Sequence, residues 1–111
     1  MTARLSLRID LPRGRLGPGK IALLEAIGRE GSISAAGRAL GMSYKRAWEL
    51  VDQVNRLLGV AAVAAVAGGA RGGGAALTQA GTALVRDYRE MEARAADAIS
   101  LPLAGLMRRI P

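Results

Sequence analysis

Residues 31–48 read GSISAAGRALGMSYKRAW, and the placement of capping, small and apolar residues in this stretch decides the fold. Ser34 is suited to cap a short helix that runs to Leu40, where Gly41 interrupts it. Ser43 is suited to cap a longer helix that ends near Leu58. The stretch therefore predicts a short helix, a tight turn and a second helix, the helix-turn-helix arrangement.

The apolar residues of this segment support that arrangement. In the second helix, Ala47, Val51, Val54 and Leu58 recur at steps of four, three and four, which indicates one buried stripe. Gly37 is small enough for the second helix to cross close to the first. The residues expected where the two helices meet are Ile33, Ala36, Leu40, Met42, Ala47 and Leu50. An ordinary helical hairpin is the alternative.

The segment before residue 31 predicts a strand followed by a helix. Apolar residues alternate with polar ones over residues 5–11, the pattern of a half-buried strand, and residues 12–17 indicate a turn-rich connection. Pro18 suits the first position of a helix, because its missing N–H would have no partner there. Ile21, Leu24 and Ile27 share one face of this helix, which is expected to end near Gly31.

The segment after Gly59 predicts a β-hairpin with a long tip. Residues 60–67 are all Val or Ala, and five of the seven residues 68–74 are Gly, each of which would cost a helix roughly 1 kcal/mol. A hairpin that directly follows the second helix is a wing, and Arg71 at its tip could meet a DNA phosphate. A glycine-rich linker is the alternative.

Thr78 is suited to cap a last helix of about twenty residues. Its apolar stripe comprises Ala80, Leu84, Tyr88, Met91, Ala95 and Ala98. Because such a helix would project beyond a small domain, we expect a homodimer with Leu24, Leu84, Tyr88, Met91 and Ala95 at the contact. The alternative is that the stripe packs on the amino-terminal strand and helix. We assign residues 1–100 to one domain and leave the tail, residues 101–111, unassigned.

Composition limits the classes of function. The 111 residues suffice for one core, and the net charge of +7 favours an anionic partner. The chain contains neither Cys nor His, which excludes the usual zinc sites and Ser-His or Cys-His catalysis, so we expect no enzyme. No run approaches the roughly 18 apolar residues of a membrane span, and we expect a cytoplasmic protein.

Residues 31–48 resemble the amino-terminal domain of the ModE family of molybdate-responsive regulators, and more distantly the LysR-type DNA-binding domain. The similarity runs from about Lys20 to Tyr88 and includes the SYKRAW motif at residues 43–48, the polyglycine wing and the LTQAG motif at residues 77–81. Full-length ModE proteins carry carboxy-terminal molybdate-binding domains, and this chain ends where those would begin. The resemblance therefore implies DNA binding, while we expect no cofactor and no molybdate binding by this chain.

In a helix-turn-helix, the start of the second helix enters the major groove. Lys45 could donate to guanine, whereas Arg46 is more suited to a phosphate contact. Trp48 could touch the DNA or be wedged against the wing, and Ser34 could cap its helix as well as contact DNA. The residues expected at the DNA are Ser32, Ser34, Ser43, Tyr44, Lys45, Arg46, Trp48 and Arg71.

The sequence as a whole predicts a mainly α fold with a small β wing, a winged helix-turn-helix with a long carboxy-terminal dimerisation helix. The predicted function is sequence-specific binding of operator DNA by a homodimeric transcriptional regulator of the ModE type. A separate protein would then sense the effector. The alternative is a winged helix used for protein–protein contact, without DNA binding.

Overall fold

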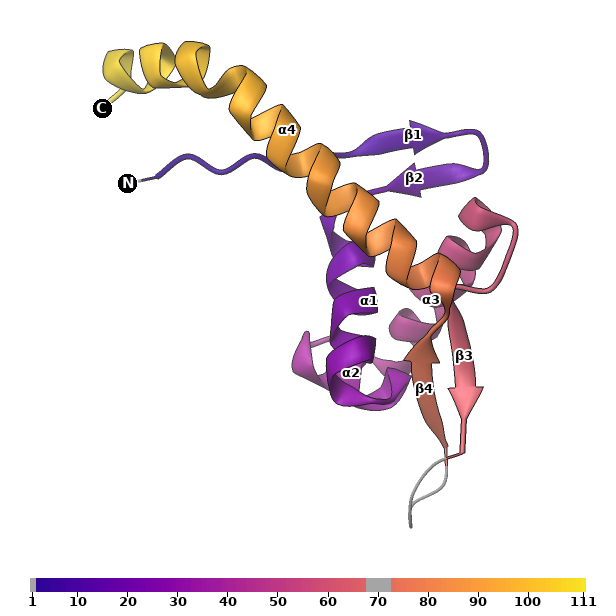
Figure 1. Ribbon diagram of the computed structural model, residues 1–111. Helices are drawn as coiled ribbons and strands as arrows, with labels where there is room; N and C mark the ends of the chain where they lie inside the picture. The colour runs from indigo at the N-terminus through magenta and orange to yellow at the C-terminus, as the bar shows by residue number, and fades with distance from the viewer. Residues whose placement is uncertain (1, 68–72) are drawn as a thin grey trace.

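The computed structural model of the chain describes residues 2–67 and 73–111, and helices dominate that part (Figure 1). Its helices are α1 (Pro18–Glu30), α2 (Ile33–Ala39), α3 (Tyr44–Leu58) and α4 (Gln79–Arg109). Its strands are β1 (Ile9–Leu11), β2 (Gly14–Leu16), β3 (Val63–Val66) and β4 (Gly74–Leu77). They form two separate antiparallel hairpins, β1–β2 and β3–β4, at opposite ends of the helical core (Figure 1). The mainly α fold with a small β wing is confirmed.

The helix-turn-helix lies where the sequence predicts it. The Gly37 carbonyl accepts the N–H of Met42 at 2.9 Å, and a Cβ on Gly37 would lie only 3.3 Å from that of Ala47, so α2 and α3 cross closely. Gly41 holds the turn in the left-handed region with φ of 70°. The predicted stripe of α3 is confirmed, because Ala47, Val51 and Val54 are buried and Leu58 is half-buried.

One of the expected helix caps is wrong. The hydroxyl of Ser32, rather than that of Ser34, accepts the N–H of Ala35 at 3.0 Å and begins α2. Ser34 lies in the first turn of α2 and accepts a hydrogen bond from Arg38 at 2.8 Å. The helix begins earlier because Ile33, already helical, is buried in the core against α1 and α3.

The amino-terminal segment is a short hairpin rather than the single strand predicted over residues 5–11. Only Ile9–Leu11 pair, with Ile9 opposite Leu16 of β2. Leu16 is almost completely buried beside Ile21 and Tyr88, so the segment predicted as a connection contributes to the core. Residues 2–8 stay outside the ladder, and the Leu7 carbonyl accepts the hydroxyl of Tyr88 at 2.7 Å.

The predicted wing is confirmed by the second hairpin, in which Val63 lies opposite Leu77 and Val66 opposite Gly74. The N–H of Ala75 donates to the Gly31 carbonyl at 2.9 Å, which ties the wing to the end of α1. The predicted tip residue Arg71 lies outside the described residues.

Thr78 joins the wing to α4 and confirms the predicted cap. Its hydroxyl accepts the N–H of Gly81 at 3.1 Å and donates to the Ala61 carbonyl at 2.7 Å. Its backbone N–H donates to the Ala62 carbonyl at 2.9 Å. Gly81 passes so close to this carbonyl that a Cβ on Gly81 would overlap it. The start of α4 is therefore held by three hydrogen bonds and one close backbone contact.

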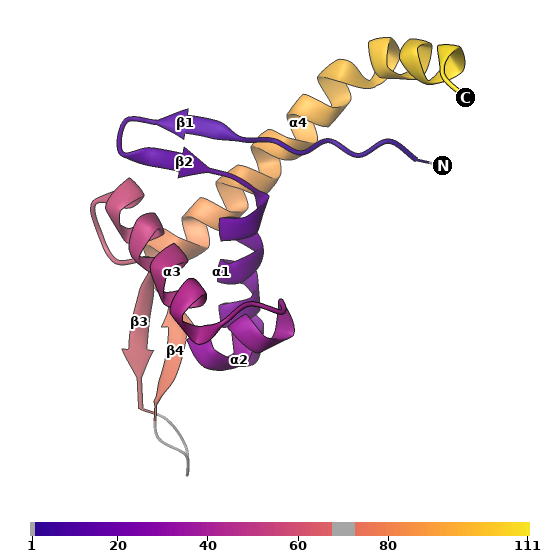
Figure 2. The ribbon, with the colours of Figure 1, turned by 180° about the vertical axis from the view of Figure 1, so that it is seen from behind.

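Helix α4 is longer than predicted, because it continues through Pro102 to Arg109 instead of ending near Ala98. Proline removes the hydrogen bond to the carbonyl four residues earlier, here that of Ala98, which is exposed and accessible to water. Figures 1 and 2 show the last turns of α4 bending away from the axis of the rest and projecting beyond the core. None of the helices in the described ranges is both long and apolar enough to cross a membrane.

Candidate nucleic-acid interface

The amino-terminal half of α3 presents an exposed surface of polar and aromatic side chains. Ser43 caps the helix by accepting the N–H of Arg46 at 3.0 Å, which fixes where the helix begins. The side chains of Tyr44 and Trp48 are 59% and 45% exposed and meet edge to face, with ring centroids 6.3 Å apart. The predicted groove-facing residues of α3 therefore share one solvent-exposed surface, while Ala47 faces the core.

Trp48 also borders a hollow of about 240 Å³ between α3, the start of α2 and the wing. The residues around it include Ser32, Ser34 and Tyr44, together with Ala65 and Gly73–Ala75 of the wing. Trp48 therefore lies next to the wing, as one sequence interpretation predicts, and remains half exposed, while its contact with DNA stays a prediction. The hollow therefore brings together four of the predicted residues, Ser32, Ser34, Tyr44 and Trp48, whereas Ser43, Lys45 and Arg46 do not line it.

Charge is unevenly distributed along α3. Lys45 has no carboxylate within 4 Å among the described residues, so its ammonium is available to a partner. Arg46 pairs with Glu49 at 3.5 Å, and Arg56 pairs with Asp52. These pairs are exposed and therefore weak, and a phosphate could compete with them. The start of α3 is thus more positive than its middle.

Three polar residues beside this surface were not predicted from the sequence. Arg38 is exposed and donates to Ser34, which places a cation at the start of α2. Glu49 and Asp52 lie with Tyr44, Lys45 and Trp48 around a shallow depression on the outer face of α3. Their spacing of four and seven residues from Lys45 is a sequence signal that could have placed both carboxylates on this face.

The residues predicted for the dimer contact do not all reach the surface. Leu24 and Tyr88 are completely buried within the single chain, so they have no surface to offer a partner and that assignment is wrong. Leu84 is half-buried and packs in the core of its own chain. The alternative in which the stripe packs on its own domain therefore describes the first turns of α4. Of the predicted contacts, Met91 and Ala95 retain exposed surface, and Met91 is 41% exposed.

Comparison with known proteins places this architecture in a family. Residues 19–82 match the family described as bacterial regulatory helix-turn-helix protein, lysR family. The full-length LTTR LysG from Corynebacterium glutamicum, solved with bound effector Arg, superimposes with a TM-score of 0.60 and is 28% identical. That comparison covers 86% of this chain and 31% of LysG.

Similar proteins include two whose names refer to molybdenum. The molybdenum-pterin-binding protein MopB of Rhodobacter capsulatus is 51% identical over 86 residues, which cover 78% of this chain and 32% of MopB. The molybdenum transport protein ModE of Azotobacter vinelandii is 46% identical over 90 residues, 81% of this chain and 33% of that protein. The DNA-binding transcriptional dual regulator ModE of Escherichia coli is 37% identical over 100 residues, 84% of this chain and 38% of that protein.

The chain thus spans about a third of the length of the relatives it matches, in each case with its helix-turn-helix region. The family match begins in α1 and ends in α4, so it includes α2, α3 and the wing. Because it extends over more than half of the 111 residues, the chain belongs to the LysR family of bacterial regulatory helix-turn-helix proteins.

Proposed function

We propose that this chain binds operator DNA as a homodimer and acts in molybdenum-related gene regulation. The observation that supports DNA binding most strongly is the exposed surface of Ser43, Tyr44, Lys45, Arg46 and Trp48 at the start of α3. A B-DNA major groove about 12 Å wide admits one helix, and the start of a recognition helix is the part that reaches the bases.

The donors on this surface suit distinct parts of the DNA. Lys45 is unpaired within the described residues and suits the acceptors O6 and N7 of guanine. Arg46, at the edge of the surface, suits a phosphate that would replace Glu49 as its partner. Tyr44 and Trp48 offer ring edges to a thymine methyl or a sugar. Ser32 and Ser34, beside the hollow, suit the adjacent backbone.

The link to molybdenum rests on the relatives. MopB and the ModE protein of Azotobacter vinelandii have molybdenum in their names, and the ModE protein of Escherichia coli is named a DNA-binding transcriptional dual regulator. A transcriptional regulator among the relatives agrees with a regulatory role for this chain. The absence of His and Cys from the chain restricts catalytic chemistry further.

The proposed homodimer rests on the projecting part of α4. Met91, Leu101 and Leu106 are 41%, 83% and 45% exposed, and all three lie beyond the turns that pack on the core. Large apolar side chains that recur along one projecting helix favour contact with a second apolar surface. A second copy of α4 supplies such a surface by symmetry.

The test of DNA binding combines selection from random duplexes with titration of the selected site by fluorescence anisotropy. We expect Lys45→Ala to weaken specific binding by roughly 1–3 kcal/mol and to relax the preference at one base position. Arg86→Ala on α4 removes a cation outside the proposed interface and serves as the matched control. Failure of the unmodified protein to bind any duplex at low salt would contradict the proposal and favour the protein-contact alternative.

We further propose that the chain itself binds no molybdate specifically. An oxyanion site needs donors that converge in a folded pocket, whereas Ser32, Ser34, Ser43 and Lys45 belong to the proposed DNA interface. Isothermal titration with molybdate, with sulfate as the control, is expected to show no difference between the two ions. Stoichiometric micromolar binding of molybdate alone would contradict this.

A further inference from the structure

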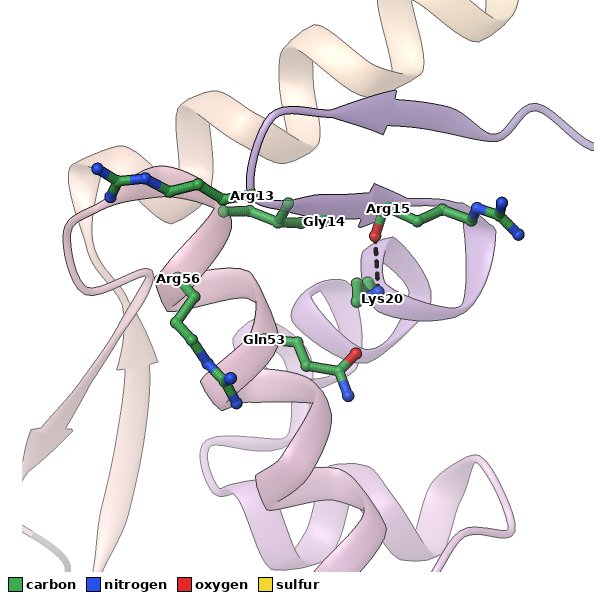
Figure 3. Close-up of a pocket in the computed structure, with 7 residues that line it drawn as sticks. Arg13, Gly14, Arg15, Lys20, Gln53 and Arg56 are labelled. Carbon is green, nitrogen blue, oxygen red and sulfur yellow. Dashed lines mark hydrogen bonds between the residues drawn. The ribbon is translucent and has the colours of Figure 1, made fainter.

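A second group of cations lies apart from the proposed recognition surface. The β1–β2 hairpin, the start of α1 and the second half of α3 surround a cavity of about 140 Å³ (Figure 3). The residues that line it are Arg13, Gly14, Arg15, Lys20, Gln53, Arg56 and Leu57. Four of these seven are basic, and none belongs to the predicted DNA-binding residues, so this surface requires its own explanation.

The cavity retains an excess of positive charge. Arg15 is bonded to Asp10 at 2.8 Å and Arg56 to Asp52, whereas Arg13 and Lys20 have no carboxylate within 4 Å in the described part of the chain. Four cations and two carboxylates leave a local charge of +2. Burial lowers the pKa of Lys20, and the positive charges of Arg46 and Arg15 lower it further. An anion placed here would therefore relieve repulsion among cations.

The directions of the side chains indicate what kind of anion fits. The Nζ atom of Lys20 is held at the cavity by the Arg15 carbonyl, 2.6 Å away (Figure 3). In Figure 3, the guanidinium groups of Arg13 and Arg15 point to opposite sides and that of Arg56 points away from both. A single small oxyanion needs donors that converge on it. Cations that spread along a surface instead match a row of phosphates, which a DNA strand presents every 3.4 Å of helix rise.

The cavity lies on the side of α3 opposite the wing. Trp48 and Asn55 of α3 border a separate cavity of about 110 Å³ against the wing. Gln53 and Leu57 of α3 border the cavity next to the β1–β2 hairpin. Figure 2 shows α3 between the two hairpins, with the wing on one side and β1–β2 on the other. A helix in the major groove has one sugar-phosphate strand on each side of it. With α3 in the groove, the wing would face one strand and the cavity would face the other.

We propose that Arg13, Lys20 and Arg56 bind backbone phosphates of the DNA strand on the side of α3 opposite the wing. This inference rests on the proposed DNA-binding function and adds a second, sequence-independent contact surface to it. The β1–β2 hairpin precedes residues 19–82, so Arg13 extends the interface beyond the segment that matches the family.

The inference is tested with the full chain and the double variant Arg13→Ala/Lys20→Ala, by anisotropy with duplex DNA at several salt concentrations. Loss of two phosphate contacts is expected to reduce the slope of log K against log salt by about 1.8 for each chain, which corresponds to roughly 60-fold weaker binding at 0.1 M salt. The loss is expected to be similar for specific and random duplexes. The double variant Arg86→Ala/Arg94→Ala removes two exposed cations of α4 and is the charge-matched control. Lys20→Arg is expected to retain the slope.

Three outcomes separate this inference from the function on which it rests. No DNA binding by the unmodified protein would remove the proposed function itself. A steep salt dependence that the double variant shares with the wild type would overturn only the phosphate contact. The third outcome comes from titration with inorganic phosphate. If the wild type binds phosphate at micromolar concentration and the double variant does not, the cavity is a site for a free oxyanion, and the DNA contact is overturned. Circular dichroism of both variants verifies that β1–β2 and the helices remain folded.

Discussion

At the scale of single residues, Gly81 shows how closely the backbone segments approach. Its backbone passes over the Ala62 carbonyl with no room for a Cβ, whereas a Cβ on Gly19 in α1 would meet nothing within 4 Å. We expect Gly81→Ala to lower the free energy of unfolding by roughly 1–3 kcal/mol or more, because backbone has to move. Gly19→Ala, the control, is expected to raise it by about 0.4–1 kcal/mol. Equal effects in denaturant titrations would contradict this account.

The residue scale also shows which details the sequence can specify. Ser43 and Thr78 cap their helices as predicted, since each is the only capping residue close to its helix start. Ser32 and Ser34 both lie at the start of α2. Which of the two caps the helix depends on the burial of Ile33 by residues of other elements. Leu24 and Tyr88 were assigned to the dimer contact from apolar periodicity and from the expected projection of the last helix, neither of which distinguishes packing within a chain from packing between chains.

At the scale of elements, α1 and α4 are linked by an ion pair whose contribution to stability depends on pH. Arg89 donates to both oxygens of Glu25, at 2.6 and 3.1 Å, which lowers the pKa of Glu25 below its ordinary value of 4.5. The stabilisation is therefore complete above pH 4.5 and is lost as pH falls through the lowered pKa of the folded state.

We expect Glu25→Gln to lower the free energy of unfolding by about 1 kcal/mol or less at pH 7, since both side chains are partly exposed. At a pH below both pKa values the variant and wild type are expected to be equally stable. Glu30→Gln, which alters an exposed pair with Arg29, is the control. Urea titrations at pH 7 and at low pH measure the difference, and a difference that persists unchanged in acid would contradict the prediction.

Elements differ in how far local sequence determines them. The helix-turn-helix and the wing were predicted because caps, glycines and apolar periodicity agree there. The β1–β2 hairpin was not predicted, because each of its strands is only three residues long and the hairpin is fixed by the burial of Leu16 against α1 and α4. The path of α4 through Pro102 was missed because proline predicts a helix end, whereas an exposed helix can bend there. The DNA contacts predicted on α3 remain predictions.

At the scale of the whole molecule, the chain extends over 55 × 29 × 20 Å, and the projecting part of α4 exposes apolar side chains. We expect a dimer in analytical ultracentrifugation, and an operator that is an inverted repeat with half-sites about 34–36 Å apart or a multiple of it. Leu101→Asp is expected to yield monomers, because an unpaired charge would enter the apolar contact. Leu101 is 83% exposed, so the fold of the single chain does not depend on it.

Ser100→Asp is the matched control for that experiment, since it adds the same charge one position earlier on a different face of α4. It is expected to leave the sedimentation coefficient nearly unchanged. A monomeric wild type at micromolar concentration would show that α4 does not pair, and the exposed residues of its second half would then require another partner.

The junction at Thr78 has a mechanical consequence. Strand β4 passes directly into α4, and the hydroxyl and N–H of Thr78 fasten this point to Ala61 and Ala62, just before β3. The wing and α4 are therefore coupled mechanically at Thr78, the point where both are held to the core. If a partner rotates the distant end of α4, the helix transmits the torque along its length to Thr78. The wing must then rotate with α4, or the hydrogen bonds of Thr78 to Ala61 and Ala62 must break.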